Sequence, residues 1–471
     1  MNESFLRFYH ALPGPARSSV ATLWGAYLYC LRYGMSADDL VEQALDRDRW
    51  SSERWKRWQE ERLAYCLHRA ATRVPYYREL WSKRRKAGDR ASWEDLQNWP
   101  ILEKDEVRRQ PERFVADDRE RRWMWQDSTS GTTGTPLGLW FSRATIREWY
   151  ALCEARSRRW YGVSRGDRWA CLGRKLVVPP ATRRPPFWVW NGAFKQLYMS
   201  SYHLAPDLIP RYLDALRRYD ISYLLGYTAS LYALAQGVLE LGRRDVRMQV
   251  VITNAEPLFE HQRSVIAEAF QCPVRETYGM TELGAAASEC EQGAMHLWPE
   301  VGWVEIVPDR DTLDEGEGGD LVCTGLLNLD MPLIRYRVGD RASRPPPGPL
   351  CSCGRLPFIL RSVDGRSGDV LYTIDGRALS SNCVEVIFKP GVALREAQII
   401  QESFDRVRLR VVPAAGFTEA MTGTLINGVR QRMGPVHVIV DLLDRIPREA
   451  NGKFRVVISR LRATAKVSGT N

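Results

Sequence analysis

A segment rich in glycine and hydroxyl residues, "DSTSGTTGTPLG" at residues 127–138, has the composition of a loop that wraps a polyanion. Six Ser or Thr residues and three glycines occupy its twelve positions. Small residues expose backbone N–H groups, and hydroxyls add further donors for phosphate oxygens. The usual GxxxxGK[ST] phosphate loop carries a lysine near its end, whereas this segment ends in Pro136-Leu137-Gly138. If it binds phosphate, the positive charge must come from elsewhere in the chain.

Five further segments carry groups suited to nucleotide chemistry: "TNAEP" (253–257), "ETYGMTELG" (276–284), "MPLIRYRVGD" (331–340), "DGRSGD" (364–369) and "PREANGKFR" (447–455). Each is a weak signal alone. In this order and at these spacings, the set resembles the adenylate-forming ligase superfamily, which activates carboxylates with ATP. The resemblance covers nearly the whole chain. The NAEP and YGMTE segments are similar to the phenylacetate–CoA ligase branch, and residues 199–235 resemble its capsular-polysaccharide-associated relatives.

The pattern along the chain indicates an α/β fold. From residue 123, helical patterns alternate with short apolar runs such as "ISYLLGY" and "MQVVITN", which predicts mixed or parallel sheets. We expect a large ATP- and acid-binding domain over 1–363, with a helical part at 1–95. A hinge linker over 364–369 leads to a small mobile α+β domain over 370–471. In the latter, "EAQIIQESFDRVRLRVVP" and "HVIVDLLD" predict strands separated by a helix at 417–433.

The resemblance implies a nucleotide-binding role for each matching position. The phosphate-wrapping residues would be Ser130, Gly131, Thr132, Thr133 and Gly134, and the nucleotide-binding segment after the strand-like "QVVI" would be Ala255, Glu256 and Pro257. Tyr278 offers a flat face for adenine, and Gly279 allows close approach of the backbone. Asp340 is an acceptor suited to the ribose hydroxyls, and Arg366 would assist it.

The catalytic residues implied by the resemblance are Thr281, Glu282 and Lys453. Thr281 would donate to the α-phosphate, and Glu282 is a hard oxygen ligand suited to Mg²⁺. Lys453 is the expected source of the missing charge: it follows the Asn451-Gly452 turn and would reach the α-phosphate and the substrate carboxylate during the first half-reaction. Relatives usually carry Asp or Lys at the hinge position that Gly368 occupies, which leaves the tuning of the pivot open.

Three cysteines and a histidine form a second candidate site. Cys290, His296, Cys351 and Cys353 make a Cys₃His set, which suits a four-coordinate, structural zinc ion. The phenylacetate-ligase relatives include members with zinc at matching positions. The alternative is a buried thiol at Cys290 and a tight turn at "CSCG".

The expected activity is a two-step ligation that forms acyl-AMP, releases pyrophosphate and transfers the acyl group, with coenzyme A as the first-ranked acceptor. The alternatives are an amide-forming ligase acting on an amine or amino sugar, an adenylyltransferase to a cofactor hydroxyl, and a zinc-stabilised nucleotide-binding scaffold without turnover. The acid pocket is expected between residues 199–230 and 253–284, with Tyr202, Tyr223, Tyr227 and Phe259 as aromatic surface. The identity of the acid is not predicted.

Composition and charge limit the kinds of binding partner that the sequence predicts. The formal net charge of +10 is dispersed along the chain, a pattern that suits small anionic substrates rather than nucleic acid. The apolar run at 21–34 is shorter than the roughly 20 apolar residues of a membrane span and contains Arg32, so we expect no transmembrane segment, although peripheral membrane contact stays open. Scattered cysteines and no signal peptide predict a cytoplasmic location. A homodimer is compatible with the sequence.

Overall fold

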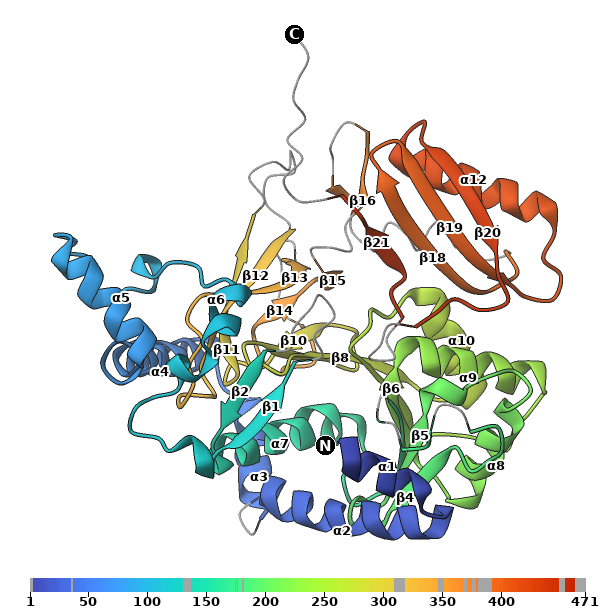
Figure 1. Cartoon of the computed structure of the whole chain (residues 1–471), viewed down its shortest axis with the longest axis horizontal. Helices are drawn as coiled ribbons and strands as arrows, with labels where there is room; N and C mark the ends of the chain where they lie inside the picture. Colours follow the sequence, from blue (N-terminus) through green and yellow to red (C-terminus); the bar gives the residue numbers. More distant parts are fainter. Residues whose placement is uncertain are drawn as a thin grey trace.

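The computed structural model describes residues 3–34, 37–129, 137–173, 175, 177–179, 182–308, 318–345, 351–366, 371–374, 378–379, 392–448 and 454–461. The predicted loop residues Ser130, Gly131, Thr132, Thr133 and Gly134, the hinge residue Gly368, and Lys453 lie outside these ranges. Figure 1 shows a large body formed by the N-terminal and central segments, and a smaller body, in orange and red, formed by the C-terminal segments.

The first part of the chain is helical. Its helices are α1 (Glu3–Ala11), α2 (Gly14–Arg32), α3 (Ala37–Arg47), α4 (Ser52–Arg73) and α5 (Pro75–Lys86). Helix α4 begins after Ser51, whose Oγ accepts a hydrogen bond from the Arg54 N–H (3.3 Å) and so satisfies one of the helix's unpaired donors. Helix α2 packs along strand β4 (Trp188–Asn191) and helix α7 (Arg143–Ser157). Within the described ranges, no helix combines the length and apolar character that a membrane span requires.

A nine-stranded sheet forms the centre of the large body, in the order β14-β10-β9-β8-β7-β6-β3-β5-β4. Besides β4, its strands are β3 (Trp169–Gly173), β5 (Gln196–Ser200), β6 (Tyr223–Tyr227), β7 (Val250–Asn254), β8 (Val274–Gly279), β9 (Ala286–Glu289), β10 (Met295–Leu297) and β14 (Ile359–Leu360). Strands β3, β5, β6, β7 and β8 are parallel to one another. Parallel strands are buried on both faces, which explains their near-continuous apolar runs.

Helices α8 (Ile209–Arg218), α9 (Thr228–Glu240) and α10 (Glu260–Phe270) connect these parallel strands. Leu213, Leu231 and Ile266, one from each helix, share a core with Leu224 of β6. Ligands of such sheets bind beyond the carboxyl ends of the strands, which places the expected site at Tyr227, Asn254 and Gly279. The predicted α/β class is confirmed.

Smaller elements cover this end of the sheet. An antiparallel sheet has the order β11-β12-β13-β15, with strands β11 (Gly302–Val307), β12 (Gly318–Gly325), β13 (Tyr336–Ser343) and β15 (Ser362–Arg366). Strands β1 (Trp125–Ser128) and β2 (Gly138–Phe141) form an antiparallel pair. The remaining helical elements are α6 (Lys104–Arg109) and the 3-10 turns η1 (Leu96–Asn98), η2 (Pro111–Phe114), η3 (Arg121–Trp123), η4 (Arg159–Tyr161), η5 (Gly192–Phe194) and η6 (Ser201–His203).

The C-terminal body has a four-stranded sheet in the order β20-β19-β18-β21. Its elements are β18 (Leu394–Ser403), β19 (Arg406–Pro413), α12 (Glu419–Met433), β20 (His437–Leu442) and β21 (Val457–Ser459), with a short pair β16 (Leu371–Tyr372) and β17 (Ala378–Leu379). Ile399, Leu409 and Val429 belong to a core of their own. A separate core is the property that lets a domain move as a unit against its neighbour.

Candidate active site

A cavity of about 420 Å³ opens at the carboxyl ends of the parallel strands. Its walls come from α2, β1, α7 and the ends of β6, β7 and β8. The lining includes four predicted site residues: Ala255, Tyr278, Gly279 and Thr281. The predicted nucleotide residues of two distant segments therefore meet at one cavity.

Tyr278 and Asp340 are in direct contact. The Tyr278 hydroxyl donates a 2.8 Å hydrogen bond to Asp340 Oδ2. Burial, together with the neighbouring Asp340 carboxylate, holds the pKa of Tyr278 well above its usual value, so the phenol stays protonated and able to donate. Asp340 on β13 pairs with Arg366 on β15 in the strand register. The structure thus brings together the predicted adenine-binding ring and the predicted ribose-binding pair.

Glu282 lies just beyond β8 and is almost fully buried. Its Oε1 accepts hydrogen bonds from Lys104 Nζ (2.9 Å) and from the Tyr336 hydroxyl (3.1 Å). Its Oε2 has no hydrogen-bond partner among the described residues. A carboxylate held in this way keeps one oxygen for a hard cation, so the donor set fits Mg²⁺. Lys104 lies in no segment recognised in the sequence, and Tyr336 lies in "MPLIRYRVGD", where only Asp340 was given a role.

The Ala255–Pro257 segment connects the two bodies. Ala255 adopts the left-handed conformation (φ 63°), which costs a non-glycine residue free energy and is typical of functional turns. Glu256 Oε2 accepts from Ala229 N–H at the start of α9, and Oε1 accepts from Phe454 N–H in the C-terminal body, both at 2.8 Å. The Glu256 side chain, which was expected to contact the nucleotide, therefore binds the backbone of Phe454, the residue that directly follows Lys453.

The ends of the predicted phosphate loop are fixed by hydrogen bonds. Ser128 and Gly138 are register partners in β1 and β2. Thr129 N–H donates to Leu137 O (3.1 Å), and Leu137 N–H donates to Thr129 Oγ1 (3.0 Å). Because Trp125 and Asp127 of β1 line the cavity, the predicted phosphate-binding segment leaves and re-enters the fold beside it.

The four predicted zinc ligands are brought together. Their ligand atoms all lie within 4.8 Å of one another. Cys290 Sγ is 3.6 Å from Cys351 Sγ, and Cys353 Sγ is 3.3 Å from His296 Nε2. Tetrahedral zinc with bonds of about 2.0 to 2.3 Å requires ligand spacings of roughly 3.5 to 3.8 Å. His296 Nδ1 contacts Leu356 O at 2.7 Å, the partner that fixes the tautomer of a zinc-binding imidazole.

The aromatic residues expected for the acid pocket do not line this cavity. Tyr202, Tyr223, Tyr227 and Phe259 are outside the cavity lining. Tyr223 is fully buried and its hydroxyl accepts from Arg158 Nε (2.8 Å), and Phe259 lines a different cavity, beside Phe454. The rings that line the cavity come instead from β1, β2, α7, β8 and the Trp298 turn: Trp125, Phe141, Trp149, Tyr150, Tyr278 and Trp298.

Comparison with known proteins defines the class. The family model "AMP-binding enzyme" matches residues 56–325, more than half of the chain, and the chain belongs to this family of adenylate-forming ligases. A second model, "CapK C-terminal domain", matches residues 371–460.

Relatives with the same organisation agree with this assignment. Protein CapK of Staphylococcus aureus is 22% identical over 82% of this chain and 85% of its own length. The phenylacetate-coenzyme A ligase of Thermus thermophilus is 26% identical over 86% of this chain and 96% of its own.

Solved structures of 2-hydroxyisobutyryl-CoA ligase share the fold. In the postadenylation state with R3-HIB-AMP, the TM-score is 0.66 at 20% identity, over 88% of this chain and 91% of that one. In the thioesterification state the TM-score is 0.50 at 22% identity over the same shares.

Proposed function

We propose that this ligase joins a carboxylic acid to coenzyme A through an acyl-adenylate. An oxygen of the acid attacks the α-phosphorus of ATP, and the P–O bond to pyrophosphate breaks with its electron pair on the leaving group. The coenzyme A thiolate then attacks the acyl carbon, and AMP leaves. The observation that carries the proposal is the Tyr278–Asp340 pair beside buried Glu282, at a cavity large enough for an acid.

The residues divide the work by position. Tyr278 gives adenine a stacking face, Asp340 accepts from the ribose hydroxyls, and Ser130–Gly134 with Thr281 donate to the phosphates. Glu282 holds Mg²⁺, which neutralises phosphate charge when bound. Preorganised donors and cations of this kind stabilise the charge that develops in the transition state.

Lys453 supplies the positive charge that the phosphate loop lacks, and movement of the C-terminal body carries this lysine into and out of the active site. The Glu256–Phe454 hydrogen bond supports this assignment, because it holds the neighbour of Lys453 against the large body at Glu256, which directly follows the cavity-lining Ala255. The second half-reaction then follows a rotation that withdraws Lys453. Because residues 364–366 belong to β15 and pair with β13, the pivot would be the part of the predicted 364–369 linker that follows this strand. The Cys₃His cluster would hold a structural zinc ion, since all four positions are protein ligands and leave no place for a reacting water.

The alternative acceptor predicted from the sequence is an amine or amino sugar, with an amide as product.

Two measurements test the proposal in sequence. Acid-dependent exchange of labelled pyrophosphate into ATP tests the first half-reaction, and absence of exchange with every acid of a broad panel contradicts carboxylate activation. Mass spectrometry of products with coenzyme A, with amines and with neither then identifies the acceptor. AMP transferred to a hydroxyl compound would instead support an adenylyltransferase, and ATP binding without any product would support a scaffold.

A further inference from the structure

Two arginines line the cavity at the end remote from the nucleotide residues. Arg32 ends helix α2, and Arg158 directly follows helix α7. Apart from Asp127, they are the charged residues of the described lining, and the walls between them and the strand ends are largely aromatic. Cations in such surroundings are costly to bury without a partner.

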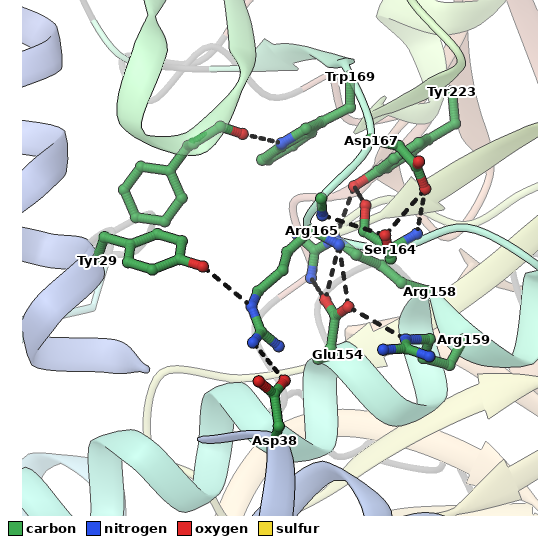
Figure 2. A network of polar contacts seen from close by, with 12 residues as sticks. Tyr29, Asp38, Glu154, Arg158, Arg159, Ser164, Arg165, Asp167, Trp169 and Tyr223 are labelled. Atoms are coloured by element: carbon green, nitrogen blue, oxygen red, sulfur yellow. Dashed lines mark hydrogen bonds and ion pairs between the residues drawn. The ribbon is translucent and has the colours of Figure 1, made fainter. Parts of the chain in front are cut away.

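Arg158 is held rigidly but keeps donors for a ligand. Its Nε donates to Tyr223 Oη (2.8 Å), its Nη1 is 3.7 Å from Glu154 Oε2, and its guanidinium lies 5.1 Å from the centre of the Trp169 ring. Figure 2 shows this network, with Glu154 between Arg158, Arg159 and the Arg165 backbone. In the part of the chain that the structure describes, neither Nη atom of Arg158 makes a hydrogen bond. Guanidinium donors that remain in a fixed fork suit an oxyanion.

Arg32 is half-buried and paired with rings rather than with an acid. Its guanidinium lies 4.2 Å from the centre of the Tyr150 ring and 5.3 Å from that of Phe194. Among the described residues it forms no ion pair or hydrogen bond. Asp127 of the lining is exposed, and its Oδ1 accepts from Ser128 N–H. The lining itself therefore carries two positive charges and one negative charge, while the buried carboxylate of Glu154 lies behind Arg158, 3.7 Å from its Nη1.

The two arginines act on the same part of the cavity. Burial raises the pKa of the Cys153 thiol, another lining residue, to about 12, and the charges of Arg158 and Arg32 both oppose that rise. Phe194 connects the two arginines in space. Its carbonyl accepts a 3.0 Å hydrogen bond from Trp169 Nε1, the ring against which Arg158 lies, and its own ring lies 5.3 Å from the Arg32 guanidinium.

The distance from the nucleotide side follows from the strand geometry. Arg158 is bonded to Tyr223, the first residue of β6, whereas Asn254 and Thr277 lie at the carboxyl ends of β7 and β8. A five-residue strand such as β6 spans about 13 Å at 3.3 Å per residue. Arg158 therefore lies too deep to serve the α-phosphate. Arg32 lies against Phe194, just before the first residue of β5, so both arginines face the far end of a bound acid.

We propose that the acid carries a second oxyanion, such as another carboxylate, separated from the activated carboxylate by an apolar, ring-sized spacer, and that Arg32 and Arg158 bind it. The aromatic walls accommodate the spacer. The positive charges of the two arginines offset the cost of taking the second oxyanion out of water, a cost that would otherwise favour an acid with one carboxylate only. This inference rests on the proposed ligase activity and adds the substrate class.

Matched acids test the inference. Pyrophosphate exchange is measured with 1,4-phenylenediacetate against 4-ethylphenylacetate, and with suberate against octanoate. We expect kcat/KM for each diacid to exceed that of its monoacid by at least about 10-fold, the value of a charge-assisted hydrogen bond.

Arg32→Leu, which keeps apolar contact with Tyr150, should bring the diacid-to-monoacid ratio close to one, and Arg32→Lys should restore part of it. Arg54→Leu, which removes an arginine stacked on Trp50 outside the cavity, should leave the ratio unchanged.

The outcomes separate the two levels of the proposal. Exchange that favours the monoacids, or a ratio that Arg32→Leu does not change, overturns the substrate class while the ligase activity stands. An equal loss for both acids in Arg32→Leu assigns Arg32 a structural role and also overturns it. Exchange with no acid at all overturns the ligase proposal itself.

Discussion

The two ends of the cavity are built in different ways. At the nucleotide end, the ring, hydroxyl and carboxylate groups come from a run of six residues, Thr277–Glu282, and from Asp340 on a neighbouring sheet. At the other end, the charged and aromatic groups come from α2, and from α7 with Arg158 directly after it, two segments that are more than a hundred residues apart. Chemistry shared by a family is thus encoded locally, and the part that selects the acid depends on how distant elements pack.

The largest expected effect is on stability, and it comes from the Cys₃His cluster, which lies outside both ends of the cavity. Cys353→Ser should remove the bound zinc and cost about 4 kcal/mol of unfolding free energy, the range seen when a structural metal is lost. The measurements are metal analysis and thermal unfolding.

Cys272→Ser is the matched control, because Cys272 is a partly buried thiol outside the cluster. Purified protein without zinc, or equal stability of the two variants, would contradict the structural role of the cluster.

At the nucleotide end, Lys453→Ala should slow acyl-adenylate formation by about a hundredfold or more, since a positioned cation is worth roughly 3–4 kcal/mol in such a transition state. The loss should be the same for diacids and monoacids, because Lys453 serves the group that all acids share. Transfer from a preformed acyl-adenylate should be nearly intact.

Lys56→Ala, at an exposed position on α4, is the control for loss of a lysine. Equal loss in both half-reactions, or a loss that depends on the acid, would remove Lys453 from this role.

Asp340→Asn tests the ribose contact with a smaller expected effect. The amide keeps the shape but weakens the acceptors, so KM for ATP should rise roughly 10-fold, as expected when a hydrogen bond to a charged group is weakened. KM for the acid should not change.

Tyr278→Phe, which removes the donor to Asp340 but keeps the ring, should raise KM for ATP by less. A change in acid preference in either variant would show that the two ends are not independent.

Glu256→Gln gives the smallest expected effect, because it perturbs docking rather than chemistry. An amide can accept from only one of the two N–H groups that Glu256 now binds, so adenylation should slow by up to about 10-fold. Glu240→Gln, which alters an exposed contact to Arg395 in the C-terminal body, is the control. Equal effects on adenylation and transfer would mean that the contact does not belong to the adenylation arrangement.

The sequence allowed the fold class and the nucleotide end to be predicted for physical reasons. Apolar runs without alternation mark strands buried on both faces, and the predicted helix at 417–433 corresponds to α12, Glu419–Met433. The Cys₃His set could be proposed because soft ligands in that number have few other uses. Strand order was not predictable, since it depends on pairing between distant segments.

The acid end escaped prediction for the same reason. Arg32 has the pattern of an ordinary last-turn arginine, and Arg158 is one of two adjacent arginines in "SRRW". Lys104 is one basic residue among several in α6. Nothing local distinguishes a side chain that lines a cavity from one in solvent. The aromatic residues chosen from the sequence lie outside this cavity lining, and Tyr223 is fully buried, because aromatic residues near a site are commonly core.

Helix α2 has a consequence for how such enzymes diversify. It precedes the region that matches the AMP-binding family, which begins at residue 56, yet its last turn forms one wall of the cavity through Leu28, Leu31 and Arg32. Substitutions there change the shape and charge that an acid meets without altering any residue that handles ATP. The helix is therefore a natural place for evolution, or for an engineer, to exchange one substrate for another while the adenylation chemistry is inherited unchanged.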